Sequence, residues 1–216
     1  MNIGDPFPAG AEIAGQVAAS NDTYNATLSI DGLSLIFTSN LSSPGQYRLY
    51  RATRPAVLSD FGPPVLLATT VGVPLSTDLQ PSLTADGDLW FIADRGAVNV
   101  DYDLFHAAAV DGGFAPPMPA IGEVNSTSSE TKAVFTRDGL RIFFGSARLG
   151  PASQADIWTA TRTSKNLEFS GAVRVIELAT ASNERPAWIS PDACRLYFTS
   201  DRTGKDQIYV ASRPAR

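Results

Sequence analysis

One pattern occurs four times along this chain, and the even spacing of the copies limits the folds open to it. Each copy centres on an aspartate between two short apolar runs, as in SIDGLSLIF and TRDGLRIFF. A phenylalanine followed by a short apolar run recurs with the same period. Because the aspartate and the phenylalanine share one period, the copies are true internal repeats. The aspartates are Asp31, Asp86, Asp138 and Asp192, with spacings of 55, 52 and 54 residues, and the phenylalanines are Phe7, Phe61, Phe114 and Phe169.

Each copy supplies four strand candidates, which are short β-branched and aromatic runs bounded by turn residues. In the last copy the first three are PAWIS, RLYFTS and QIYVASR, and in the other copies a fourth follows the phenylalanine. The Asp-Gly pair of the first three copies predicts a tight hairpin, because glycine accepts a positive φ and aspartate tolerates it. The connections are too short for a crossover helix, so the strands are expected to pair antiparallel.

Four-stranded antiparallel sheets at this period predict an all-β fold, a four-bladed β-propeller. The chain starts with a strand of the fourth type near FPAGAEIAGQ and finishes with the first three strands of a copy. We therefore expect the N-terminal strand to complete the last blade and close the ring, which hides exposed sheet edges. Residues 1–216 then form a single domain, with repeats at about 7–60, 61–113, 114–168 and 169–216.

Composition excludes several classes of protein. With 44% hydrophobic and 18% charged residues, 216 residues can bury a core. The formal charge is -5 and no basic run occurs, so nucleic acid is not an expected partner. The longest apolar stretch, PPVLLATTVGVPL, is short and broken by prolines, so neither membrane insertion nor an export signal is expected. A lone cysteine, Cys194, excludes an internal disulfide and a cysteine-based metal cluster.

The last copy carries a recognisable motif. It reads RPAWISPDACRLYFTSDRTGKDQIYVAS, which resembles the P-x-x-S-P-D-G, F-x-S-D-R and D/Q-I-Y-V elements of the TolB-like repeat, the WD40-like Pro-Asp repeat, with Ala193 in place of glycine. The resemblance covers nearly the whole chain and implies a β-propeller, protein partners, and a bacterial periplasmic or extracellular location. This chain departs from TolB, which has six blades and an additional domain.

An acid and an arginine recur together at one end of the predicted sheets. This end, where the first strand of each copy begins, is called the upper face below. The structural interpretation is one ion pair per blade, because a guanidinium grips a carboxylate in fork geometry. The alternative is that the three acids surround the mouth of the central channel and hold a cation. The pairs are Asp78 with Arg95, Glu130 with Arg148 and Glu184 with Arg202.

Little in the sequence points to catalysis. His106 is the only histidine and occupies a strand position that holds Thr159 in the third copy. No G-x-S-x-G elbow is present to support a hydrolase. Asp101 and Asp103 are a carboxylate pair that a glycosidase could use, but they also fit a turn-rich loop. We therefore expect no catalytic residue, no cofactor and no enzymatic activity.

The leading hypothesis is a non-enzymatic module that binds a protein or peptide through the loops of the upper face. These loops vary most between copies and carry Tyr24, Tyr47 and Tyr102, a residue type suited to recognition. The alternative is a small ligand or cation at the channel mouth. There Trp188, whose aligned partners are small, is expected to plug the channel or to contact a ligand. A monomer is expected, although the first strand could complete a blade in another copy.

Overall fold

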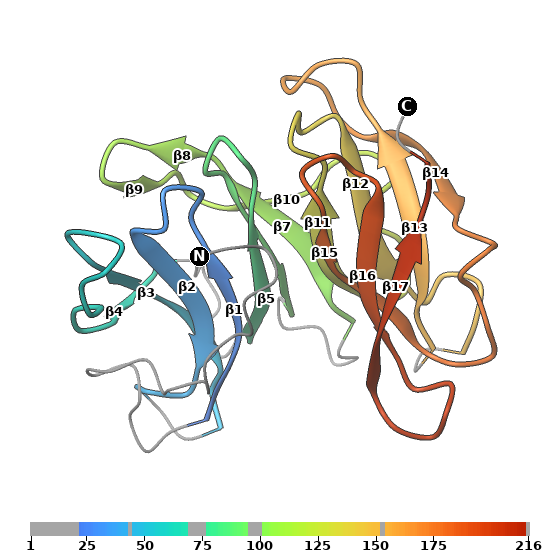
Figure 1. Cartoon of the computed structure of the whole chain (residues 1–216), viewed down its shortest axis with the longest axis horizontal. Helices are drawn as coiled ribbons and strands as arrows, with labels where there is room; N and C mark the ends of the chain where they lie inside the picture. Colours follow the sequence, from blue (N-terminus) through green and yellow to red (C-terminus); the bar gives the residue numbers. More distant parts are fainter. Residues whose placement is uncertain (1–21, 43–44, 69–76, 95–100, 152–153, 215–216) are drawn as a thin grey trace.

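The computed structural model describes residues 22–42, 45–68, 77–94, 101–151 and 154–214. These residues form strands, turns and loops without a helix, so none of them forms a helix able to cross a membrane. The strands build four antiparallel sheets (Figure 1). Blade 1 contains β1 (Thr23–Leu28), β2 (Ser34–Ser39), β3 (Arg48–Thr53) and β4 (Val65–Leu66); blade 2 contains β5 (Asp78–Leu83), β6 (Leu89–Ala93), β7 (Asp103–Ala107) and β10 (Met118–Pro119). Blade 3 contains β11 (Glu130–Phe135), β12 (Arg141–Ser146), β13 (Asp156–Thr161) and β14 (Ser170–Arg174); blade 4 contains β15 (Glu184–Ile189), β16 (Arg195–Ser200) and β17 (Gln207–Ser212); β8 (Ala109–Val110) and β9 (Gly113–Phe114) form a separate hairpin.

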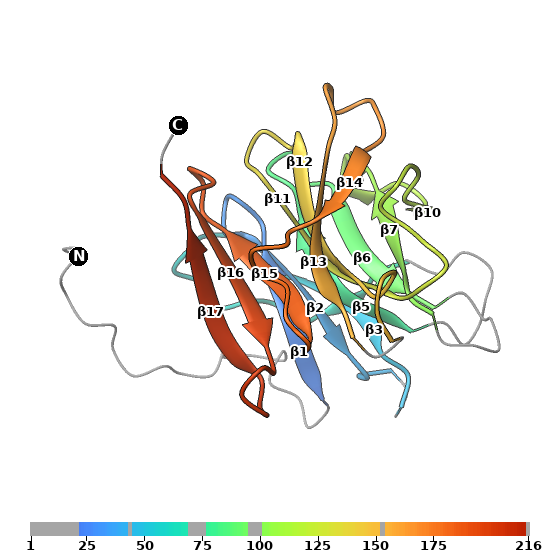
Figure 2. The same cartoon turned by 90° about the vertical axis from the view of Figure 1, so that its right-hand side faces the viewer.

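The sheets are the blades of a four-bladed β-propeller, as the repeat predicted. The first strand of each blade is innermost, and consecutive inner strands contact one another: β1 with β5, β5 with β11, and β11 with β15. In blade 4 the described strands lie side by side in the order β15, β16, β17, with β17 outermost (Figure 2). The predicted N-terminal strand that would complete this blade lies outside the described residues.

The hairpins between first and second strands depend on a left-handed turn residue. Gly32, Gly87 and Gly139 have φ values of 72°, 91° and 70°. Ala193, which replaces the glycine in the last copy, still adopts φ 55°. The left-handed conformation places Cβ close to the following carbonyl oxygen, so an alanine there is strained.

A bulge interrupts each inner strand near its upper end. The register shifts between Tyr24 and Thr27 in β1, and at the equivalent place in β5, β11 and β15. Asn25 and Gln80 take up a positive φ there, of 54° and 53°. A bulge bends the strand and re-aims the side chains beyond it, so the upper ends of the inner strands differ in direction from their lower parts.

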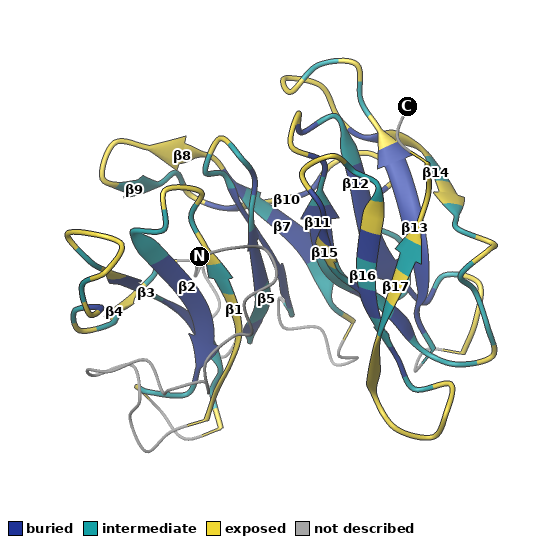
Figure 3. Ribbon diagram, viewed as in Figure 1, coloured by how far each residue is buried: buried dark blue, intermediate teal, exposed yellow. Residues whose placement is uncertain are grey.

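The core lies between the blades. Each second strand alternates, with residues such as Phe91 and Phe144 facing the preceding blade and Trp90 and Ile92 facing the next one. In blade 2 this strand, β6, is buried along its length, and in blade 3 β12 is buried at every residue after Arg141 (Figure 3). The packed layers of aromatic and aliphatic side chains hold the blades together and place their loops on a common upper face.

Candidate binding site at the upper face

Backbone hydrogen bonds join consecutive blades at the upper face. The amide of Asp78 donates to the carbonyl of Tyr47 over 3.0 Å, and the amide of Glu130 donates to the carbonyl of Tyr102 over 2.7 Å. The amide of Glu184 donates to the carbonyl of Ala155 in the same way. Each acid at the top of an inner strand therefore lies against the residue just before the third strand of the preceding blade.

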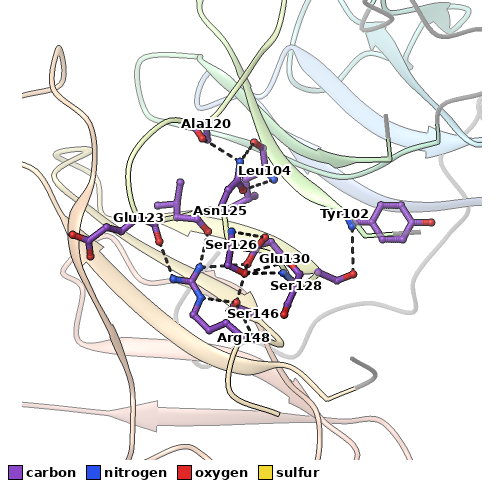
Figure 4. A network of polar contacts seen from close by, with 12 residues as sticks. Tyr102, Leu104, Ala120, Glu123, Asn125, Ser126, Ser128, Glu130, Ser146 and Arg148 are labelled. Atoms are coloured by element: carbon purple, nitrogen blue, oxygen red, sulfur yellow. Dashed lines mark hydrogen bonds and ion pairs between the residues drawn. The ribbon is translucent and has the colours of Figure 1, made fainter. Parts of the chain in front are cut away.

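Glu130 is fully buried and sits at the centre of a polar network (Figure 4). Its Oε1 accepts hydrogen bonds from Ser126 Oγ at 2.6 Å and from Ser146 Oγ at 2.8 Å, and lies 3.3 Å from Arg148 Nη2. Burial raises the pKa of the Glu130 carboxyl, while the two serines and the arginine charge act in the opposite direction. These hydrogen bonds and the arginine charge compensate for burying a carboxylate away from water.

Arg148 extends this network to the loop before β11. Its Nη1 donates to the carbonyl of Glu123 and its Nη2 to the carbonyl of Val124, both over 2.9 Å (Figure 4). The guanidinium carbon also lies 4.7 Å from the centre of the Trp158 ring. The arginine thus binds a carboxylate, two carbonyls and an aromatic face.

Blade 4 repeats the arrangement. Glu184 is fully buried, and its Oε1 accepts from Thr180 Oγ1 at 2.6 Å and from Ser200 Oγ at 2.8 Å. Arg202 Nη2 lies 3.3 Å from the same oxygen. The carboxylates of Glu130 and Glu184 are therefore both engaged within their own blades.

Asp78 in blade 2 lies close to an arginine of the preceding blade. Its fully buried carboxylate is 3.8 Å from Nη1 of Arg48, a residue of blade 1. Its expected partner, Arg95, lies outside the described residues. Over the part of the chain that the structure describes, no group of three or more His, Cys, Asp or Glu side chains is placed to hold a metal ion.

Two of the predicted tyrosines meet on blade 1. The rings of Tyr24 and Tyr47 lie 5.1 Å apart at 51°, and Tyr47 donates its hydroxyl proton to Asp22 Oδ2 over 3.1 Å. Burial raises the pKa of Tyr24 to about 12, with smaller contributions from Tyr47, Asp22 and Tyr102. Tyr102 belongs to blade 2 and packs partly against the core between blades 2 and 3, but it lies near enough to Tyr24 to contribute to this rise in pKa. Sequence reasoning missed Asp22, although its place just before the first strand was a usable signal.

Tyr102 lies in a segment that carries several carboxylates. Burial raises the pKa of Tyr102, and the nearby charge of Asp94 adds to it. The pKa of Asp103 is also raised, by burial and then by the neighbouring charge of Asp101. Ser129 Oγ donates to Asp101 Oδ1 over 3.2 Å and fixes the start of this loop. We call Tyr24, Tyr47 and Tyr102, with Asp22, Asp94, Asp101 and Asp103, the tyrosine patch.

The other predicted residues lie away from the tyrosine patch. His106 is in the middle of β7, with its ring 4.8 Å from that of Trp90 and its Nε2 3.4 Å from Asp88 Oδ2. Trp188 lines the central cavity and is 52% exposed, with its ring 5.5 Å from that of Tyr197. Sequence reasoning did not single out Lys132, which lines the same cavity.

No protein-family model and no curated protein matches the sequence. Solved structures do resemble the fold. A TolB protein of Agrobacterium tumefaciens superposes with a TM-score of 0.59 at 19% identity, and TolB of Acinetobacter baumannii with 0.56 at 15%. An alpha-L-arabinanase of Penicillium chrysogenum superposes with 0.57 at 14%. The matches cover 90%, 87% and 89% of this chain but only 59%, 40% and 58% of those structures, so the chain spans about half their length.

The third neighbour corrects one expectation. The sequence led us to expect a protein without enzymatic activity, yet an arabinanase shares the fold. Because fold does not determine function, the absence of a recognisable catalytic motif was not sufficient ground for excluding an enzyme. What the comparisons establish is the architecture: the chain folds as a TolB-like β-propeller.

Proposed function

We propose that the chain is a binding module that holds a basic segment of a protein or peptide against the tyrosine patch. The observation that carries the proposal is the contact between the rings of Tyr24 and Tyr47 beside Asp22, with Tyr102 and further carboxylates of the next blade nearby. The resemblance of the repeat to TolB-like proteins, which implies protein partners, supports the same choice.

The chemistry of the patch favours a positively charged ligand. Aromatic faces attract ammonium and guanidinium groups, and carboxylates pair with them. Burial and the Asp101 charge raise the pKa of Asp103, so a cation placed beside these two aspartates would relieve their repulsion. The formal charge of -5 adds a long-range attraction for a basic partner.

The test is a fluorescence-anisotropy titration with a labelled lysine- and arginine-rich peptide, beside an acidic peptide of the same length. We expect saturable binding of the basic peptide only, and weaker binding as salt is added, because exposed ion pairs are screened. Tyr102→Ala is expected to weaken binding about tenfold or more, as truncation of a central aromatic contact does.

Matched substitutions separate the patch from the overall charge. Asp101→Asn and Asp111→Asn each remove one negative charge, but Asp111 lies in the turn of the β8–β9 hairpin, away from the patch. The proposal predicts that only Asp101→Asn weakens binding of the basic peptide. Equal effects of the two variants, or binding of the acidic peptide with similar affinity, would contradict it.

A further inference from the structure

The inner strands of all four blades enclose a central cavity of about 440 Å³. Its wall includes Thr27 of β1, Ser82 of β5, Val134 of β11 and Trp188 of β15. These four residues hold the same position in their strands, and three of them are small. Trp188 lines this volume and remains half-exposed, so part of its ring is accessible to a ligand.

Lys132 gives the cavity its charge. Among the described residues that line it, Lys132 is the only one with an ionisable side chain. Across the described ranges, no carboxylate forms an ion pair with its ammonium group. The backbone amide of Lys132 donates to Gln80 Oε1 over 2.6 Å, which ties β11 to β5 at this level.

A cation without a counter-charge in such a wall is costly to the folded protein. Burial lowers the pKa of the Lys132 ammonium, the direction expected when a cation leaves water without gaining a partner. Natural proteins seldom keep an unpaired charge in a cavity unless it has a use. An anion that entered the cavity would supply the missing charge.

The rest of the wall combines polar and apolar groups. Thr27 and Ser82 contribute polar atoms, and Leu28, Leu83 and Trp188 contribute apolar surface. The Trp188 ring contacts that of Tyr197 at an angle of 55°, and 52% of the tryptophan is exposed. A wall with one cationic group, further polar positions and one exposed aromatic ring suits a small amphiphilic ligand.

We propose that the central cavity binds a small organic carboxylate, with its anionic group on Lys132 Nζ and its apolar body against Trp188. The site is separate from the tyrosine patch and takes a ligand of the opposite charge. Each of the two proposals can therefore be confirmed or contradicted without affecting the other.

The test uses phenylacetate and hexanoate as probes and the uncharged phenylacetamide as the matched control. Trp90 and Trp158 are buried and Trp188 is half-exposed, so ligand contact at Trp188 should change the tryptophan emission. We expect a saturable change with the carboxylates that phenylacetamide does not produce. The carboxylates should also raise the melting temperature, because a ligand that binds the folded state stabilises it.

Substitutions then test whether the positive charge of Lys132 is needed for carboxylate binding. Lys132→Met should weaken carboxylate binding about tenfold or more, since an ion-paired hydrogen bond is lost, while Lys132→Arg should retain most of it. Lys205→Met removes an exposed lysine outside the cavity and should bind as the wild type does. Lys132→Met should melt no lower than the wild type, because it removes a desolvated charge.

Three results would overturn the proposal. They are the absence of saturable binding at millimolar carboxylate, equal binding of phenylacetamide, and unchanged affinity in Lys132→Met. If Lys132→Met does not fold, Trp188→Ser replaces it, with the melting temperature as the readout; an unchanged ligand-induced shift would then contradict the site. Tyr102→Ala should bind carboxylates normally, which keeps this test apart from that of the tyrosine patch.

Discussion

Ile157 and Ile208 occupy the same position in the third strand of consecutive blades, yet Ile157 is 1% exposed and Ile208 is 77% exposed. The equivalent residues of the first two blades, Leu49 and Leu104, are completely buried. In each of blades 1 to 3, the following blade covers this position. The corresponding side of blade 4 has no such cover among the described residues.

This difference predicts unequal costs of truncation. Ile157→Ala should lower the free energy of unfolding by about 2–5 kcal/mol, as core truncations do. Ile208→Ala should change it by no more than about 0.5 kcal/mol. Urea denaturation measures both. A comparable loss in the two variants would mean that the Ile208 side of blade 4 is covered in solution, and light scattering would then test the expectation of a monomer.

Ala193 offers a stabilising substitution. Its φ of 55° is left-handed, so Ala193→Gly should raise the free energy of unfolding by about 1 kcal/mol. Gly32→Ala is the reciprocal control, because Gly32 has φ 72° and an added Cβ would meet no atom closer than 3.6 Å. That variant should lose about 1 kcal/mol. A destabilised Ala193→Gly would contradict the turn geometry.

The Glu130 network predicts strong coupling between two residues. Arg148→Met leaves a buried carboxylate without its cation and should cost about 3 kcal/mol. The double variant Glu130→Gln with Arg148→Met should cost less than the sum of the single changes, since no charge then remains to be compensated. A double-mutant cycle from denaturation curves measures this coupling. Simple additivity would show that the ion pair is not formed.

The hairpin aspartates predict how stability depends on pH. A hydrogen bond from Thr136 Oγ1 to Asp138 Oδ1, followed by one from the backbone amide of Leu140, holds the pKa of Asp138 below its ordinary value of 3.8. The unfolded chain therefore binds this proton more readily than the folded one. The stabilisation is complete above pH 3.8 and is lost as the pH falls from 3.8 through the lower folded-state pKa.

Asp138→Asn should reduce this loss of folding stability at low pH. The amide oxygen can still accept both hydrogen bonds, but it does not titrate. Urea denaturation at a series of pH values below neutrality gives the comparison. An identical fall in stability below pH 3.8 for the variant and the wild type would show that Asp138 makes no contribution.

The local features of the fold were predictable because they depend on neighbouring residues. The Asp-Gly pairs placed the hairpins at Gly32, Gly87 and Gly139, and each has the positive φ that the turn requires. In the last copy, Ala193 replaces the glycine of the motif, and this turn residue still has a positive φ. The spacing of the copies predicted four sheets, because each copy holds the strands of one antiparallel unit.

The sites were less predictable because they form between blades. Tyr24 and Tyr102 are far apart in the chain and belong to neighbouring blades, whose inner strands β1 and β5 pack together. Asp78 lies beside Arg48 of another blade, which a search for pairs within each copy could not find. The position of Lys132 facing the cavity follows from the bulge in β11, and a bulge has no distinct sequence signal there.

The central claim, that the tyrosine patch binds a basic segment, is tested most directly by amide NMR of the protein during titration with the lysine- and arginine-rich peptide. We predict that the shifts that change are confined to Asp22–Tyr24, Tyr47–Arg48 and Asp101–Asp103. Changes centred instead on the hairpin turns at Gly32 and Gly139, or no change at saturating peptide, would contradict the claim.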